Sequence, residues 1–160
     1  MHRKTDSQIG AAMVEFLVGC PVLLMVMMGI IQLSLLWTGQ SAVETAAHFA
    51  ARKFALHART DIRKAKEAAL AEAASVCLHR PGGKSGSTRL TSIEFSRQGK
   101  APPAHTALPG EAYCLRLTHW LELSVPFINR ILFVIAPVKK KRTRDQYFLL
   151  LHSSRWVTVE

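Results

Sequence analysis

Residues 11–37 read AAMVEFLVGCPVLLMVMMGIIQLSLLW, and Glu15 is the only formal charge among them. As a helix rising 1.5 Å per residue, these 27 residues would be about 40 Å long, more than the ~30 Å hydrocarbon core of a bilayer. Their thirteen Leu, Ile, Val and Phe residues favour insertion by about 4–8 kcal/mol, whereas one acid at the helix centre costs roughly 3 kcal/mol. The block therefore predicts a transmembrane helix; a buried core helix of a soluble protein is the alternative.

The rest of the chain has a different character. Over all 160 residues the hydrophobic fraction is 49%, the charged fraction 20% and the formal net charge +10, which excludes disordered, collagenous and heptad-repeat chains. Outside the apolar block the chain is polar and basic. We therefore expect a leader at 1–10, a membrane helix at 11–37 and an external domain at 38–160, helical over 40–78 and mostly strands and loops over 88–160.

The flanking charges orient the helix. Arg3 and Lys4 precede it, and the first basic residue after it is Arg52. The positive-inside rule then places the N-terminus in the cytoplasm and Thr38 onward outside, with Trp37 as an interfacial aromatic. A cleaved secretory signal is the rival interpretation, but the apolar run is about twice the usual length and residues 38–42 imitate a cleavage site only weakly.

The start of the block carries a recognisable motif. A short basic leader is followed by Gly10, then by Glu15 as the fifth residue after it and Phe16 as the sixth. This pattern resembles the processing site of type IV prepilins, in the form of the Flp/Tad subgroup. With Pro21 and the Ala-rich stretch 43–52, the sequence is similar to the TadE-like minor pseudopilins of tight-adherence systems. The good match covers residues 8–55, and beyond it the resemblance is architectural.

The resemblance implies a function. TadE-like proteins are expected in the bacterial inner membrane, with a prepilin peptidase cutting after Gly10 and leaving Ala11 as the new N-terminus. The implied partners are other pilus subunits, assembly-platform proteins, the peptidase and the lipid bilayer. No cofactor, no metal and no small-molecule substrate is implied. The alternative is a permanently anchored single-pass protein whose basic external domain binds an anionic partner.

Each motif residue also has a physical interpretation. Gly10 gives a peptidase close access to the backbone. Glu15 lies near the positive end of the mature helix, where it can pair with the amino group of Ala11 on its own chain or a neighbour's, or it is simply an interfacial carboxylate. Pro21 removes a helical hydrogen bond, which is either an ordinary membrane-helix kink or a point where the helix loosens as a subunit leaves the membrane.

The external part predicts an α+β fold: a long N-terminal helix, a second helix and a small antiparallel sheet. The first helix continues to about Ala58, and Thr60 or Asp61 caps a second helix to about residue 78. Strands are expected at 90–97 and 113–125, and a last strand or strand pair at 146–151 and 155–159. In the strand at 113–125 the odd residues from Leu115 to Val125 share one face.

Residues 126–138 are strongly apolar but too short to span a membrane. They predict either a buried turn or short helix, or an element lying on the outer face of the inner membrane or against a neighbouring subunit.

Three cysteines are present. Cys20 lies in the membrane block, whereas Cys77 ends the second helix and Cys114 begins the clearest strand, both on the oxidising side. We expect a Cys77–Cys114 disulfide, with two free buried thiols as the alternative.

The chain shows no enzyme signature. Its seven histidines have no metal-ligand spacing, and no phosphate loop, nucleophile elbow or carboxylate pair appears, so we expect neither a metal site nor an enzyme. The sharpest charge run is Lys139, Lys140, Lys141, Arg142 and Arg144. It is either a patch for an anionic partner or a solvated basic loop.

Overall fold

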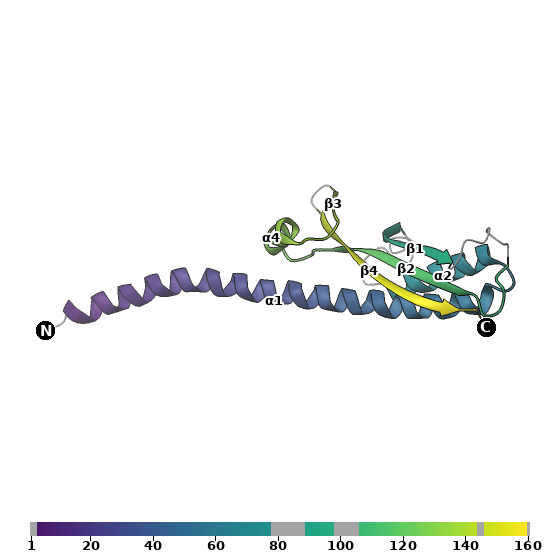
Figure 1. Ribbon diagram of the computed structural model, residues 1–160. Coiled ribbons are helices and arrows are strands. Elements are labelled where there is room, and N and C mark those ends of the chain that lie inside the picture. Colours follow the sequence, from purple (N-terminus) through teal and green to yellow (C-terminus); the bar gives the residue numbers. More distant parts are fainter. Residues whose placement is uncertain (1–2, 78–88, 98–105, 144–145, 160) are drawn as a thin grey trace.

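The computed structural model describes residues 3–77, 89–97, 106–143 and 146–159, with side chains from Met13 onward. The predicted α+β class is confirmed: a long helix, a second helix and a four-stranded antiparallel sheet (Figure 1). The elements are α1 (Arg3–His57), α2 (Ile62–Val76), β1 (Thr91–Arg97), β2 (Ala112–Glu122), α4 (Ile128–Ile135), β3 (Lys140–Thr143) and β4 (Gln146–Thr158).

Helix α1 is a single helix of 55 residues that continues through Pro21. Its N-terminal half projects away from the other elements, which gather along its C-terminal half (Figure 1). The apolar block and the Ala-rich stretch are therefore one helix, because nothing between Trp37 and Val43 interrupts the backbone ladder.

A tight turn after α1 starts the second helix. The N–H groups of Thr60 and Asp61 donate to the carbonyl of His57, and Asp61 Oδ1 accepts from the backbone N–H of Arg63 at 2.8 Å and of Lys64 at 3.4 Å. Asp61 is therefore the N-cap of α2, as predicted, and these hydrogen bonds, that of Arg63 first, hold the pKa of its carboxyl below the usual value.

The sheet has the order β1-β2-β4-β3, with every neighbouring pair antiparallel. The predicted alternation in β2 holds, since Leu115, Leu117 and His119 are buried. Strand β2 ends at Glu122 rather than Val125, because the chain turns there toward Pro126 and α4. Of the strand or strand pair expected at the end of the chain, the single strand is formed, because its polar centre stays paired with β2 opposite Arg116 and Leu117.

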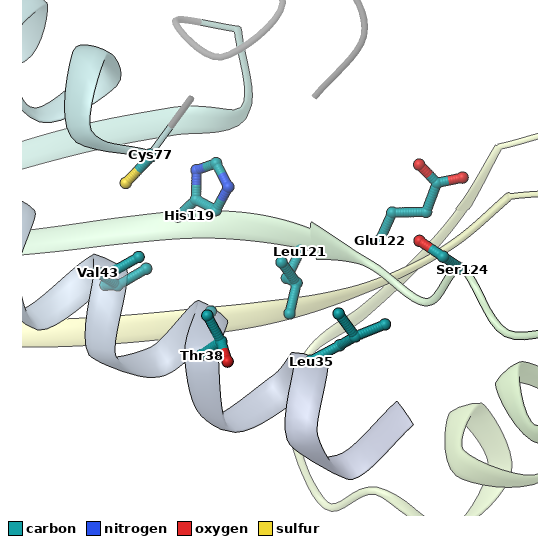
Figure 2. A pocket seen from close by; sticks show the side chains of 10 residues that line it. Leu35, Thr38, Val43, Cys77, His119, Leu121, Glu122 and Ser124 are labelled. Atoms are coloured by element: carbon teal, nitrogen blue, oxygen red, sulfur yellow. The ribbon is translucent and has the colours of Figure 1, made fainter. Parts of the chain in front are cut away.

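The sheet approaches α1 closely at Gly39. A Cβ atom at this position would lie 2.7 Å from Cδ2 of Leu121 and 3.4 Å from Cδ1 of Leu151. The same region encloses a cavity of about 250 Å³ between α1 and β2 (Figure 2). The absence of a side chain at Gly39 therefore allows the sheet to lie this close to α1.

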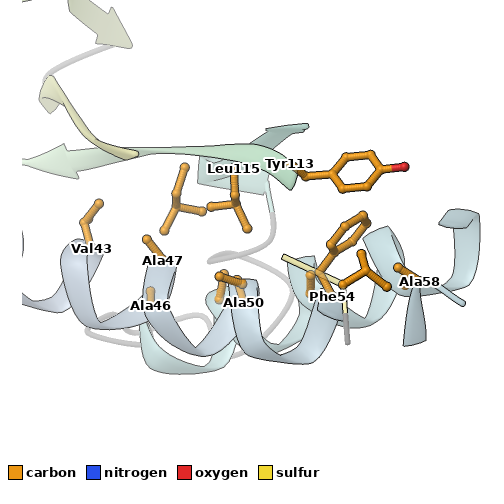
Figure 3. Close-up of a cluster of buried hydrophobic side chains, with 14 of the residues drawn as sticks. Val43, Ala46, Ala47, Ala50, Phe54, Ala58, Tyr113 and Leu115 are labelled. Atoms are coloured by element: carbon orange, nitrogen blue, oxygen red, sulfur yellow. The ribbon is translucent and has the colours of Figure 1, made fainter. Parts of the chain in front are cut away.

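The main core lies where α1, α2 and the sheet meet (Figure 3). Small side chains on the facing surfaces of the two helices allow close packing, and Phe54 fills the space toward the sheet. Its ring stacks on Phe95 with centroids 4.2 Å apart and meets Tyr113 edge-on at 5.2 Å. The buried alanines of this cluster are Ala46, Ala47, Ala50, Ala51, Ala58, Ala65, Ala69, Ala73 and Ala107.

Helix α4 and strand β3 lie at the end of the domain nearest the projecting half of α1 (Figure 1). Residues 128–135 of the apolar segment 126–138 form a short helix, in which only Ile128 is buried. The basic run is not a loop, because residues 140–143 pair with β4 as an edge strand.

Candidate functional site

The projecting half of α1 is an apolar surface that the rest of the chain leaves uncovered. By length and composition this helix can cross a membrane, and the most apolar window of the helix has no buried residue. Phe16, Leu17 and Val18 are exposed, as are nearly all residues up to Ile31. A core helix of a soluble domain would instead be buried by its own chain. The candidate interaction surface is therefore the uncovered half of α1 together with α4 and β3.

The motif residues all lie in the N-terminal part of α1. Gly10 and Ala11 are inside the helix, and Glu15 and Phe16 are exposed on it. Ala11 and Glu15 are four residues apart, so they lie on the same face of the helix about one turn from each other. Pro21 lacks an N–H, which leaves the carbonyl of Leu17 without its helical donor.

The domain first contacts α1 at Gln32, a residue that the sequence analysis passed over. Its side chain is fully buried, and its Oε1 accepts a hydrogen bond from the backbone N–H of Val125 at 2.9 Å. Its Nε2 atom is buried without a hydrogen-bond partner in the part of the chain that the structure describes. One turn later, Leu36 packs against Leu123 and Tyr147. A lone amide inside an apolar block was the signal that could have marked this boundary.

Helix α4 is apolar on its inward face and on much of its outward face. Ile128 is buried, and Leu132, Phe133 and Ala136 pack on the second cluster formed by Leu123, Tyr147 and Leu149. The outward face is exposed, with Phe127 at 73% and Val134 at 76% of their full accessible area. Phe127 begins the helix at φ 63°, an unfavourable backbone conformation for a residue with a side chain. The exposed apolar residues are Phe127, Ile131, Val134, Ile135 and Val138.

The basic run divides between the two faces of β3. Lys140 Nζ donates to the carbonyl of Val134 at 2.9 Å and lies over the ring of Phe133, which ties the strand to the end of α4. Arg142 lies over the ring of Tyr147 at 5.3 Å. Lys139 and Lys141 are exposed. Arg144, which we also predicted for this patch, lies outside the described residues.

The predicted Cys77–Cys114 disulfide is not formed, and all three cysteines are free. Cys77 is buried in the cavity between α1 and β2, near His119 (Figure 2). Cys114 alternates with the buried Tyr113 and Leu115, so it lies on the opposite face of the sheet. The sheet itself therefore separates the two sulfurs.

Among the described residues, the titratable side chains that line the cavity do not form a reactive or metal-binding group. Burial raises the pKa of the Cys77 thiol to about 11, so it is protonated at neutral pH. The Nδ1 atom of His119 is hydrogen-bonded to Oγ1 of Thr91 at 2.9 Å. Within the described ranges no three His, Cys, Asp or Glu side chains are grouped to hold a metal ion.

A polar cluster closes the far end of the sheet. Arg97 forms an ion pair with Glu111, and the hydroxyl of Tyr113 donates to Glu111 Oε2 at 3.0 Å. Burial, followed by this hydrogen bond and the carboxylate charge, raises the pKa of Tyr113. These residues fasten β1 to the loop before β2, and sequence reasoning had no motif with which to find them.

The segment that runs from the motif through the bare helix into the core has relatives among known protein families. Residues 10–52 match the TadE-like protein family. The resemblance seen at Gly10, Glu15 and Phe16 is confirmed over that segment. The TadE-like family suggests an association with Tad pili, and the matched segment lies in the helix that is able to cross a membrane. No curated protein and no solved structure matches the chain.

Proposed function

We propose that this chain is a TadE-like minor pseudopilin, an assembly protein of a Flp-type (Tad) pilus in the bacterial inner membrane. One observation carries the proposal. The bare apolar helix begins at the motif Gly10, Glu15 and Phe16, lies inside the TadE-like match, and continues unbroken into the core of the domain. Such a helix is both an anchor and a surface for packing against other subunits.

In this proposal α1 crosses the membrane once. Arg3 and Lys4 keep the N-terminus in the cytoplasm, and the sheet and α2 lie outside. The uncovered side chains of α1 are compatible with lipid before assembly and with neighbouring helices after it, since both surroundings are apolar.

A prepilin peptidase would cut between Gly10 and Ala11. The new amino group would then lie about 6 Å along the helix axis from Glu15, on the same face. Ion pairing between them, within one chain or between neighbours, would offset the cost of holding either charge in an apolar bundle. This pairing gives Glu15 its role in assembly with other pilus subunits and the assembly platform.

A second candidate function is a permanently anchored protein whose external domain binds an anionic partner. The exposed cations Lys139 and Lys141 favour it. The two functions differ in the N-terminal mass of the protein extracted from membranes, because only a processed pseudopilin lacks its first ten residues.

The test is coexpression of the full chain with a prepilin peptidase, followed by intact-mass measurement. The chain should lose ten residues, and Gly10→Val should block this loss because a branched side chain obstructs the peptidase. Gly19→Val is the matched control, because the same substitution on the same bare helix meets no other group within 4 Å. Retention of the leader by the unsubstituted chain would contradict processing.

Assembly is tested separately with Glu15→Ala. We expect normal cleavage but weakened pull-down of the other pilus subunits, since an unpaired amino group in an apolar bundle costs several kcal/mol. Glu44→Ala is the control: Glu44 is also exposed on α1 but lies beside the external domain, bonded to Gln40. If both variants pulled down the other pilus subunits equally well, the result would contradict an assembly role for Glu15.

The proposed orientation has its own test. A reporter that is active only outside the inner membrane should be active when fused after Glu160. Activity of a cytosolic reporter at that position would overturn the topology.

A further inference from the structure

We propose that α4 and β3 form a membrane-surface element that lies on the outer leaflet of the membrane crossed by α1. The apolar outward face of α4 enters the acyl boundary, and the cations around it bind anionic phospholipid headgroups. This inference rests on the proposed anchoring by α1, but not on processing or pilus assembly.

The position of the domain along α1 sets the membrane level. The described side chains of α1 are largely exposed from Met13 to Ile31, and Leu33, Leu35 and Trp37 beyond them are exposed as well. Between them Gln32 is buried and accepts the 2.9 Å hydrogen bond from Val125. We therefore place the outer boundary of the hydrocarbon between Gln32 and Trp37, where the apolar block ends and the domain begins.

Helix α4 lies at this same level. It follows Val125 by three residues, its inner side chains share a cluster with Leu36, and it is at the end of the domain that faces the bare half of α1 (Figure 1). The exposed apolar surface of α1, which continues to Trp37, thus adjoins that of α4. Continuity between the two surfaces favours one occupant for both, and for α1 that occupant is lipid.

The outward face of α4 has the pattern of an interfacial helix. Within the helix its exposed apolar residues Ile131, Val134 and Ile135 follow at steps of three and one, which keeps them on one side, and Phe127 and Val138 flank the helix. Arg130 is also exposed on this helix. An aromatic and several aliphatic side chains beside a cation are the composition that binds in the headgroup region.

The segment that contains α4 carries charges of one sign. Residues 126–143 contain Arg130 and the four consecutive cations 139–142, and no acidic residue. Lys140 holds β3 against the C-terminal end of α4, and Arg130 is an exposed cation on α4 itself. Lys141 alternates with Lys140 and therefore lies on the opposite face of β3. Each cation at an anionic surface raises binding about fivefold. An anionic leaflet therefore complements this element better than a neutral one.

Photo-crosslinking identifies the occupant directly. The full chain would carry a benzophenone amino acid at Val134 in living membranes, with Trp156 as the control, since Trp156 is 66% exposed but on β4 away from α4. We expect phospholipid adducts at position 134 and none at 156. Adducts at 134 with a second copy of the chain or another protein, without lipid adducts, would overturn the proposal.

The charge requirement is tested with the full chain in nanodiscs of phosphatidylcholine alone or with one quarter phosphatidylglycerol. Amides of 126–138 should exchange hydrogen about fivefold more slowly in the anionic discs. Arg130→Gln should remove most of this difference, because one exposed cation on α4 contributes about fivefold. Arg63→Gln, exposed at the far turn of the domain, should leave it unchanged. Equal exchange in both discs would overturn the proposal.

Failure here and failure of the proposed function are separable. Resistance of the chain to alkaline carbonate extraction reports anchoring by α1, and intact mass reports processing. A chain that is anchored but gives no lipid adduct at Val134 refutes only the surface element. A chain that gives the adduct but keeps its leader refutes only the pseudopilin.

Discussion

Replacement of Phe54 by alanine should remove a large part of the stability of the external domain. Phe54 has no exposed surface, and its ring contacts Phe95 and Tyr113 at centroid distances of 4.2 and 5.2 Å. Core Phe→Ala substitutions cost about 3–5 kcal/mol, and two aromatic pairs place this site in the middle of that range or above. We expect a loss of about 4 kcal/mol against a typical total of about 5–15 kcal/mol.

Pulse proteolysis of the full chain in mild detergent, across a urea series, measures this loss. With a denaturant slope of about 1.5 kcal/mol per molar urea, the midpoint should fall by about 2–3 M. Phe49→Ala is the control on the same helix, because Phe49 is 43% exposed, and it should change the unfolding free energy by less than about 1 kcal/mol. Equal shifts for Phe49 and Phe54 would show that the helix–sheet contact is not the core of the fold.

Three further outcomes follow from the packing and the caps. Gly39→Val should destabilise the same domain by about 1–3 kcal/mol, because the larger side chain forces Leu121 and the sheet away from α1. Gly39→Ala should change the unfolding free energy by less than about 1 kcal/mol, because the higher helix propensity of alanine offsets its smaller clash. Equal urea midpoints for the two variants would refute the close approach. Cys77 and Cys114 should be recovered unlinked in non-reducing peptide maps, and a linked peptide would contradict the fold. At pH 8 iodoacetamide should modify Cys114 faster than Cys77, since burial raises the pKa of Cys77 to about 11. The pKa of the Asp61 carboxyl is lowered from 3.8 in the folded state, so its contribution to stability is present above that value and is lost as pH falls through the folded pKa. Asp61→Asn should therefore lose less stability on acidification than the unsubstituted chain. Parallel curves of unfolding free energy against pH for the two proteins would contradict the cap.

Local patterns were sufficient for several parts of this fold. The Asp61 cap was predictable because a short acidic residue before a helical pattern has a specific hydrogen-bonding role. The buried face of β2 was predictable because alternation in a half-buried strand is strict. The motif at Gly10, Glu15 and Phe16 was sufficient to recognise the TadE-like segment.

Other features are decided by tertiary contacts. The sequence left open whether the last strand is single or a pair, because the polar residues His152, Ser153 and Ser154 interrupt the apolar pattern, and pairing with β2 continues the strand through them. The basic residues 140–143 form a strand because β4 offers them an edge, not because of their own propensity. The Cys77–Cys114 pairing required knowing which face of the sheet the helices cover, and chain order does not contain that information.

The uninterrupted backbone of α1 has a mechanical consequence. A helix of 55 residues is about 80 Å long, and the residues that form the domain core lie on its last third. Strands β2 and β4 run beside that third (Figure 1). A force applied to the membrane end of α1, as when a subunit is drawn out of the bilayer, therefore loads the helix–sheet contact in shear along its whole length. Many side chains then share the load, and no strand is pulled from the sheet one hydrogen bond at a time.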